Sequence, residues 1–311
     1  MVNKEEIKNK HVVVLMGGIS SERDVSLLSG RVCAAALEDW GFKVTSIDVD
    51  RSIGLILSHL KPDIAFNALH GGFGEDGLIQ SILEFLEIPY THSGILASAL
   101  SMDKMRAKKI VSSSGVSVCP SVLVNRITMD SQHVMSPPYI IKPLKGGSSL
   151  GVIVVTEGES VPLDVLQSSS WIHGDQLLVE QYINGIELSC GIMGEQALSV
   201  TEIVSQKSDF YTYDSKYSSS VSSHVLPANI PWSILQEVRR ISVVAHQAIG
   251  CRGISRSDFI FDPVSKEIFW LEINTQPGMT NVSIFPEMAA YAGYSFRDLL
   301  LWMLEDASCS R

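Results

Sequence analysis

Two oxygen-bearing side chains, Glu272 and Asn274, stand two residues apart in an apolar run near the C-terminus, shortly before a Pro-Gly turn. Alternate side chains of an extended strand share a face, so both groups are expected to point the same way. Asp258, in an upstream stretch that also reads as a strand, adds a third oxygen donor. Oxygen donors of this kind suit a hard cation such as Mg²⁺. Solvated polar residues of a hairpin are the alternative.

A Gly/Ser-rich loop after an expected strand is a candidate for binding phosphate. Lys142 ends the strand, and residues 145–151 read Lys-Gly-Gly-Ser-Ser-Leu-Gly. Small residues let backbone N–H groups and hydroxyls approach phosphate oxygens, and lysine adds a compact positive charge. The P-loop pattern G-x-x-x-x-G-K-[ST] is absent from the chain, and a flexible hairpin turn is the alternative. Lys104 is a second cation candidate, although a lone helical lysine is often solvated.

Two loops in the N-terminal third carry a carboxylate and a histidine. Residues 17–26 contain Glu22, and residues 70–77 place His70 among four glycines. Ligands bind at the carboxyl ends of parallel strands, so both loops are candidates for a small-molecule site. Glu22 could hold an ammonium group or interact with a helix dipole, and a lone histidine could be structural. The first loop lacks the G-x-G-x-x-G dinucleotide fingerprint.

Two later segments suggest nucleotide recognition. Glu180 and Glu187 bracket a turn, where a strand edge and a carboxylate could meet a purine edge and ribose hydroxyls. Exposed hairpin glutamates are the alternative. Residues 210–220 are aromatic, then basic, then very polar. Aromatic rings in so polar a loop need a partner, which favours a lid over a phosphate site.

These segments need a scaffold, and the apolar pattern divides the chain into three units. Over residues 1–94, short apolar strands alternate with helices, which predicts a parallel α/β domain. Residues 95–184 predict a smaller α+β unit, and residues 185–311 predict a third unit with the cation-binding strands. The expected strands of the first unit are 12–16, 43–49 and 63–69. The expected helices are 25–36, 53–60, 78–85, 102–113, 231–249 and 296–305.

Composition excludes several classes of protein. The 311 residues are enough for about two or three domains. A formal charge of −10 argues against a general nucleic-acid or anionic-membrane surface, although one pocket can still bind phosphate. We expect no secretory signal and no membrane-spanning helix. Five scattered cysteines without a Cys-x-x-Cys pair predict free thiols in a reducing cytosol.

Taken together, these segments resemble the D-alanine–D-alanine ligases, which are members of the ATP-grasp superfamily. The resemblance extends over almost the whole chain in the expected order. It is carried by residues 21–26, 70–77, 101–104, 142–143, 147–149, 211–217, 256–258 and 272–280. It implies an α/β and α+β protein, in which an N-terminal parallel α/β domain (1–94) precedes the two ATP-grasp subdomains (95–184 and 185–311).

The resemblance implies a set of nucleotide and metal ligands. Those for ATP are Lys104, Lys142, Ser148, Ser149, Glu180, Ile183, Glu187 and Lys216. The first two lysines would hold phosphates, and Lys216, on the lid, would reach the γ-phosphate. Glu180 and the Ile183 backbone would bind adenine, and Glu187 would bind ribose. Those for two Mg²⁺ ions, with Mn²⁺ able to substitute, are Asp258, Glu272 and Asn274.

The resemblance also implies residues for the amino acids and for catalysis. The substrate-binding residues are Glu22, His70, Ser283 and Ile284, and the catalytic residues are Glu22, Ser148, Tyr217, Arg256 and Gly278. Glu22 would bind the ammonium group of the first D-alanine. Ser283 and the backbone at Ile284 would bind the carboxylate of the second D-alanine. Arg256 and the Gly278 N–H would stabilise an oxyanion. Tyr217 would link through Ser148 to Glu22.

Three positions depart from the pattern of the family. Asp24 stands where glutamate is commoner, Gly146 stands where many members carry a glutamate, and Gln276 replaces a small serine or a leucine. None of them is an implied metal ligand or the lid lysine. The change at Gly146 puts in doubt the support that the glutamate would give to the Gly/Ser loop.

The implied activity is ATP-dependent ligation of two D-alanine molecules through a D-alanyl phosphate, for peptidoglycan precursors. The implied partners are ATP and D-alanine, without nucleic acid or membrane, in a cytoplasmic homodimer. D-alanine–D-lactate ligation is the nearest alternative, and the lid tyrosine argues against it. Two further alternatives are another ATP-grasp carboxylate–amine ligase and a nucleotide-binding regulatory module without turnover.

Overall fold

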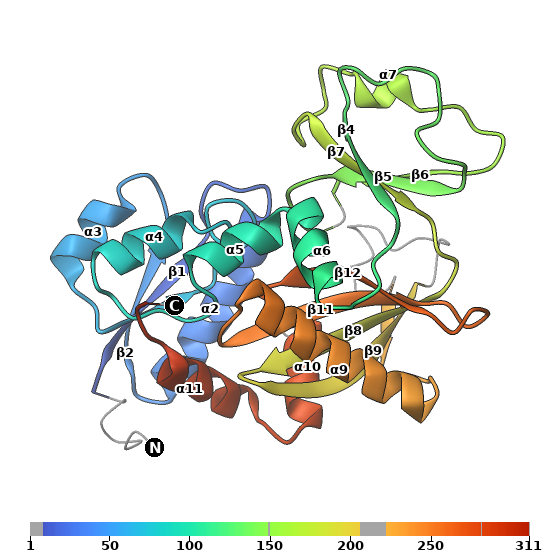
Figure 1. Ribbon diagram of the computed structural model, residues 1–311. Coiled ribbons are helices and arrows are strands. Elements are labelled where there is room, and N and C mark those ends of the chain that lie inside the picture. The colour runs from blue at the N-terminus through green and yellow to red at the C-terminus, as the bar shows by residue number, and fades with distance from the viewer. Residues whose placement is uncertain (1–8, 149, 206–221, 281, 311) are drawn as a thin grey trace.

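The computed structural model describes residues 9–148, 150–205, 222–280 and 282–310, whose strands form three sheets. Figure 1 shows the blue N-terminal sheet on the left and the green sheet standing apart at the top. The third sheet lies below the green one, beside the orange helix of the C-terminal part. The predicted combination of a parallel α/β unit with further α and β elements is confirmed.

The N-terminal sheet has three parallel strands in the order β2-β1-β3. Its strands and their helices are β1 (His11–Met16), α2 (Arg23–Asp39), β2 (Lys43–Asp48), α3 (Ile53–Leu60), β3 (Ile64–Asn67) and α4 (Leu78–Phe85). The apolar run of β1 fits its central, buried place. Parallel strands end at one edge, so the loops after β1 and β3 meet there, and Ser20 Oγ donates to the His70 carbonyl at 2.5 Å.

The small sheet is antiparallel, in the order β4-β7-β5-β6. Its elements are β4 (Ser121–Asn125), β5 (Tyr139–Pro143), β6 (Ile153–Val155), α7 (Leu163–Leu166) and β7 (Gln176–Gln181). Residues 126–138 contain neither helix nor strand, as the polar sequence predicts. Lys142 pairs with Leu178 and Ile140 pairs with Glu180, so Lys142 and Glu180 lie diagonally across neighbouring strands on the same face of the sheet.

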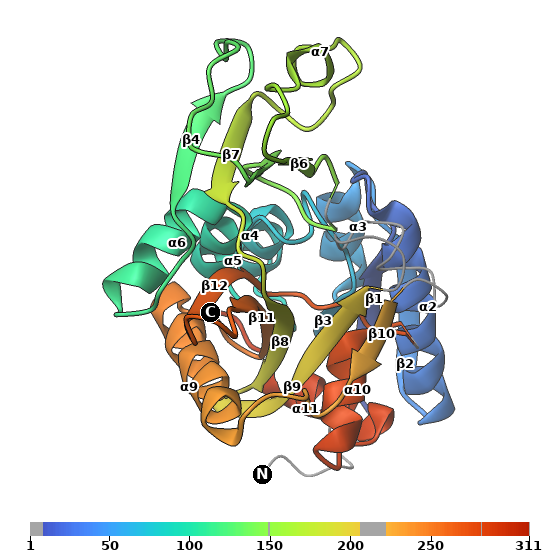
Figure 2. The ribbon, with the colours of Figure 1, turned by 90° about the vertical axis from the view of Figure 1, so that its right-hand side faces the viewer.

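The third sheet has five antiparallel strands in the order β10-β9-β8-β11-β12. Its strands are β8 (Ile186–Met193), β9 (Gln196–Ser205), β10 (Ser222–Val225), β11 (Ile254–Phe261) and β12 (Ile268–Asn274), and its helices are α9 (Trp232–Ile249), α10 (Ile284–Tyr291) and α11 (Phe296–Asp306). Figure 2 shows α9 along one side of this sheet and α10 and α11 below it. Within the described ranges, no helix is long and apolar enough to cross a membrane.

The expected helix at 102–113 is in fact the second of two helices. A helix missed by the sequence prediction, α5 (Ile95–Met102), ends where Asp103 adopts an extended conformation, and α6 (Lys104–Ser113) starts at the next residue. The Asp103 carboxylate accepts a hydrogen bond from the Arg106 N–H at 3.0 Å, which makes it the N-cap of α6. The break fixes Lys104 as the first helical residue.

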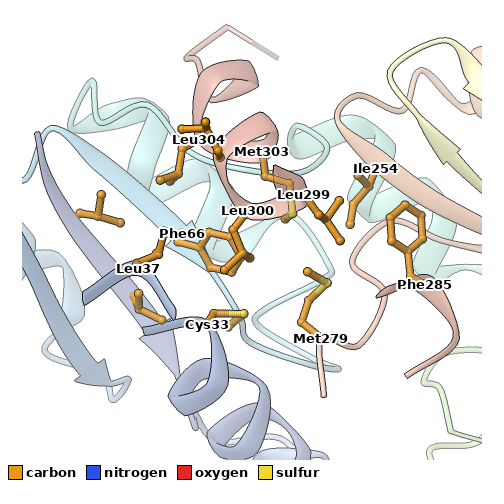
Figure 3. Close-up of a cluster of buried hydrophobic side chains, with 14 of the residues drawn as sticks. Cys33, Leu37, Phe66, Ile254, Met279, Phe285, Leu299, Leu300, Met303 and Leu304 are labelled. Carbon is orange, nitrogen blue, oxygen red and sulfur yellow. The ribbon is translucent and has the colours of Figure 1, made fainter. Parts of the chain in front are cut away.

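The C-terminal helices return to the N-terminal sheet. One buried cluster joins side chains of β1, α2 and β3 to side chains of α10 and α11. Figure 3 shows Phe66 and Cys33 beside Leu299 and Leu300, with Met279 from the loop after β12 at the edge of the cluster. The loops after β1 and β3 are therefore held against the same core as the segment that follows β12.

The N-cap of α6 yields a prediction about stability. Asp103→Ala should lower the free energy of unfolding by about 1 kcal/mol, because the first turn of α6 loses its side-chain acceptor. Thermal or urea unfolding measures the change. Asp103→Asn keeps an acceptor and should recover most of the loss. Equal losses in both variants would mean that the carboxylate charge beside Arg106 matters, and not the cap.

Candidate active site

Two adjoining cavities lie where the three sheets meet. The large cavity, of about 480 Å³, is lined by residues of the small and five-stranded sheets. The small cavity, of about 100 Å³, is lined mainly by the loops of the N-terminal sheet, β11–β12 and the segment after β12. Glu187, Asp258 and Glu272 line both. Every candidate residue that the structure describes lines one of the two cavities. Ser149, Lys216 and Tyr217 lie outside the described residues.

The two cavities meet at the strand pair β11–β12. Asp258 faces Glu272 across the pair, and Arg256 faces Asn274 two residues away, so the four polar side chains form two adjacent cross-strand pairs. The Arg256 guanidinium donates to both Asp258 oxygens, at 2.9 and 2.7 Å. Ser189 Oγ, from β8, donates to Asp258 Oδ1 at 2.6 Å. The Asp258 carboxylate is therefore fixed from two directions.

The donor set at this strand pair fits a hard cation. Asp258, Glu272 and Asn274 supply only oxygen atoms as ligands, which Mg²⁺ prefers. A carboxylate has about four acceptor positions, and the three hydrogen bonds to Asp258 leave capacity for a further ligand. Among the described residues, no group of three or more His, Cys, Asp or Glu is arranged to hold a metal. Any metal here would therefore depend on the carboxamide of Asn274 as well as on the two carboxylates.

A buried carboxylate between two lysines forms one end of the large cavity. Glu180 Oε2 lies 2.5 Å from Lys142 Nζ, and Glu180 Oε1 lies 2.7 Å from Lys108 Nζ. Burial alone would raise the pKa of Glu180, but the charges of Lys142 and Lys108 hold this pKa below its ordinary value. Burial likewise opposes the charge of Lys142, yet Glu180 and Glu272 raise the pKa of Lys142. Glu180 and Lys142 are therefore both charged at neutral pH.

The Gly/Ser loop contacts the start of α6. Lys104 Nζ donates to the Gly146 carbonyl at 2.5 Å and lies 3.7 Å from Glu272 Oε2. Gly146 has a φ of +105°, and a Cβ there would meet no atom within 4 Å. The backbone conformation therefore demands glycine, although space does not. The glutamate that the resemblance suggests would be strained in this backbone conformation.

The small cavity brings together the two N-terminal loops and the Gly/Ser loop. Ser148 Oγ donates to a Glu22 carboxylate oxygen, which links residues 126 positions apart in the chain. His70 Nδ1 lies 3.2 Å from Glu75 Oε1, and its Nε2 lies 3.1 Å from Ser29 Oγ. Burial raises the pKa of Glu75. The imidazole is held from both sides, so its orientation is set before any ligand enters.

Gln276, one of the three departures, joins the β12 turn to the N-terminal sheet. Its side chain is 1% exposed, accepts from Asn67 Nδ2 at 2.7 Å and donates to the Leu69 carbonyl. Its backbone N–H donates to Asn274 Oδ1 at 2.7 Å. One residue therefore contacts both a candidate metal ligand and the strand that leads to His70. A serine could not span these groups.

Sequence reasoning missed several residues of the site. Lys108 and Ser189 stand outside any motif, and only their place in space connects them to Glu180 and Asp258. The spacing of Lys108 four residues after Lys104 was an available signal, because positions i and i+4 share a helix face.

Solved structures share the overall fold. A D-alanine–D-alanine ligase from Bacillus anthracis, in complex with ATP, superposes with a TM-score of 0.81 at 28% identity, covering 96% of each chain. The VanG D-Ala:D-Ser ligase from Enterococcus faecalis superposes with a TM-score of 0.77 at 30% identity, covering 96% of this chain and 99% of that one. The fold is that of the ATP-grasp ligases.

Sequence comparison narrows the class to one family. Residues 111–305 match the family model described as D-ala D-ala ligase C-terminus, and residues 56–93 match the N-terminus model. D-alanine–D-alanine ligase B of Mesorhizobium japonicum is 56% identical over 308 residues, covering 98% of this chain and 100% of the relative. The Agrobacterium fabrum D-alanine–D-alanine ligase is 56% identical over 305 residues, covering 97% and 99%. The chain belongs to the D-alanine–D-alanine ligase family, which confirms the resemblance.

The bridge made by Gln276 yields a prediction. Gln276→Ser should lower the free energy of unfolding by about 1–3 kcal/mol, because Asn67 Nδ2 and the Leu69 carbonyl lose a buried partner. Thermal unfolding measures it.

Gln167 provides the matched control. Its side chain also makes two hydrogen bonds, by donating to the Arg126 and Met129 carbonyls, but it is exposed. Gln167→Ser should therefore change stability by no more than about 0.5 kcal/mol. Similar losses at both positions would contradict the special role of the buried bridge.

Proposed function

We propose that this protein joins two D-alanine molecules into D-alanyl-D-alanine, consuming ATP and releasing ADP and phosphate, for peptidoglycan precursor synthesis. The observation that carries the proposal is 56% identity over nearly full length to curated D-alanine–D-alanine ligases. The two connected cavities support it, because a nucleotide and two small amino acids need separate but adjoining places.

ATP occupies the large cavity in this proposal. Lys104 and Lys142 bind phosphates, with Ser148, Ser149 and Lys216 as further ligands. Glu180 and the Ile183 backbone bind adenine, and Glu187 binds ribose. Both Glu180 oxygens already contact lysines, but a carboxylate has enough acceptor positions to take an adenine amine as well.

The strand pair β11–β12 holds the metal in this proposal. Asp258, Glu272 and Asn274 are the ligands for Mg²⁺, with Mn²⁺ as a substitute, and their oxygen-only chemistry supports the choice. Bound there, the ion neutralises phosphate charge and makes the γ-phosphorus easier to attack. Arg256 and Ser189 position the Asp258 carboxylate, so its geometry does not depend on the ion.

The amino acids occupy the small cavity. The Glu22 carboxylate binds the ammonium of the first D-alanine, whose carboxylate attacks the γ-phosphate to form an acyl phosphate. The amine of the second D-alanine then attacks the acyl carbon, and phosphate leaves. Ser283 and the Ile284 backbone hold the carboxylate of this second molecule. Arg256 and the Gly278 N–H donate to the oxyanion, and each such donor is typically worth ~10²–10³ in rate.

Two further residues shape the small cavity. His70, held by Glu75 and Ser29, lines the cavity beside Glu22 and contributes to amino-acid binding. Tyr217 connects through Ser148 to Glu22, and the contact between Ser148 and Glu22 supports the second half of this link. The lid at 210–220 excludes water that would hydrolyse the acyl phosphate. The protein acts as a homodimer in the cytoplasm, as the family resemblance implies.

The substrate test is a competition between nucleophiles. With equal D-alanine and D-lactate, we expect mainly D-alanyl-D-alanine, formed faster at pH 8 than at pH 6, because an α-amino group with a pKa near ~8 must lose its proton. Product analysis and phosphate release measure this outcome. Glu272→Gln, which removes a metal-binding charge, serves as the inactive control. Predominant depsipeptide at pH 8 would refute the proposal.

A second prediction concerns the Gly/Ser loop. Gly146→Ala should cost about 1–2 kcal/mol, or roughly 5- to 30-fold in ATP binding, because alanine disfavours a positive φ. Calorimetric titration with ATP measures it.

Gly158, in the turn after β6, has a φ of +83° and the same open surroundings, so Gly158→Ala is the matched control. It should leave ATP binding unchanged. If the two variants bind ATP equally well, Gly146 has no part in the nucleotide site.

A further inference from the structure

A buried lysine outside the cavities contacts the nucleotide site through one carboxylate. Lys108, on α6, is 2% exposed, and its Nζ lies 2.7 Å from Glu180 Oε1 and 3.5 Å from the Trp270 carbonyl. Glu180 is also 2% exposed, and its other oxygen lies 2.5 Å from Lys142 Nζ. Glu180 and Lys142 both line the large cavity. Lys108 therefore does not line the cavity, but it contacts Glu180, which does.

The charges of this group do not cancel. Two ammonium groups share one carboxylate, so these three side chains carry a net charge of about +1. Glu272, which also acts on Lys142, has Lys104 3.7 Å away, so including both leaves the net charge unchanged. Without Lys108, the Glu180 carboxylate would pair with Lys142 alone, and this ion pair would have no net charge. An ion pair that is already neutral attracts a phosphate much less than an ammonium whose counter-ion is shared. Lys108 thus decides how much positive charge Lys142 presents to the cavity.

A purely structural function for Lys108 is the alternative. A buried lysine could simply neutralise a buried glutamate, and its loss would then lower stability alone. The position of Glu180 argues against this, since Lys142 already supplies one counter-charge. A second buried lysine is not needed for neutrality, and leaves an excess of positive charge beside a cavity. An excess charge at such a place favours an anionic ligand.

We propose that Lys108 is a positioning residue for phosphate binding, which holds Glu180 so that Lys142 keeps a net positive charge toward the nucleotide phosphates. The inference rests on the proposed function, because it takes ATP as the occupant of the large cavity. Lys108 touches no phosphate itself. Its effect should therefore depend on the presence of Glu180 and on the phosphates of the ligand.

The experiment compares ATP with adenosine, which shares the base and ribose but has no phosphates. Dissociation constants are measured by calorimetry in the presence of Mg²⁺ for the wild-type chain and three variants. Lys108→Gln keeps a hydrogen-bond donor but removes the charge, and Lys108→Arg keeps the charge. The double variant Lys108→Gln/Glu180→Gln removes one positive and one negative charge together, which restores the net charge of about +1.

The expected result is a loss specific to phosphate. Lys108→Gln should weaken ATP binding by about 10-fold or more, which is the scale expected for the loss of one partly buried charge. Adenosine binding should change by less than about 3-fold. Lys108→Arg should stay near wild type. In the double variant, the ratio of ATP affinity to adenosine affinity should return to within about 3-fold of wild type.

Two results would overturn the inference. One is an equal loss of ATP and adenosine binding in Lys108→Gln, and the other is a double variant whose affinity ratio stays as low as that of Lys108→Gln. If Lys108→Gln does not fold, the double variant, which has no unpaired carboxylate, decides the question by the same ratio. Wild-type protein that binds ATP but does not ligate D-alanine would contradict the proposed function and leave this inference standing.

Discussion

The register between β11 and β12 is the constraint on which the site depends. It sets Asp258 opposite Glu272 and Arg256 opposite Asn274, at the boundary of the two cavities. Side chains alternate along a strand, so a slip of one residue would turn one strand's pair away from the other's. Fully buried Trp270 helps to prevent such a slip, because its Nε1 donates to Ser257 Oγ on the neighbouring strand. A core residue thus fixes the place where the chemistry occurs.

Three lysines of this acidic chain lie together where an anion would bind. The formal charge is −10, yet Lys104, Lys108 and Lys142 all lie in or directly behind the large cavity. A buried ammonium is costly unless it has a partner. Glu180 and Glu272 are such partners. They raise the pKa of Lys142 and so keep Lys142 charged. The two carboxylates therefore stabilise the buried ammonium groups without neutralising all of their positive charge.

Local patterns predicted much of this molecule, and the failures have physical causes. The helix at 53–60 and the alternation of strands and helices follow from periodicity, which depends only on neighbours in the chain. The strand face shared by Glu272 and Asn274 follows from the same rule. The pairing of Lys108, on α6, with Glu180, on β7, joins residues 72 positions apart, and no local period records it. The order of the strands within each sheet likewise depends on pairing between distant segments, and the sequence patterns did not predict it.

The departure at Gln276 shows how distant parts of the site act as one unit. Its backbone holds Asn274, while its side chain holds Asn67 and the Leu69 carbonyl, next to His70. The helices that follow pack against the same N-terminal sheet, so the β12 turn is fixed by its side chain and by the core below it. A shift of the loops after β1 and β3 would therefore strain the buried hydrogen bonds of Gln276, beside Asn274. The geometries of the two cavities are consequently coupled by hydrogen bonds and packing that are already present without a ligand.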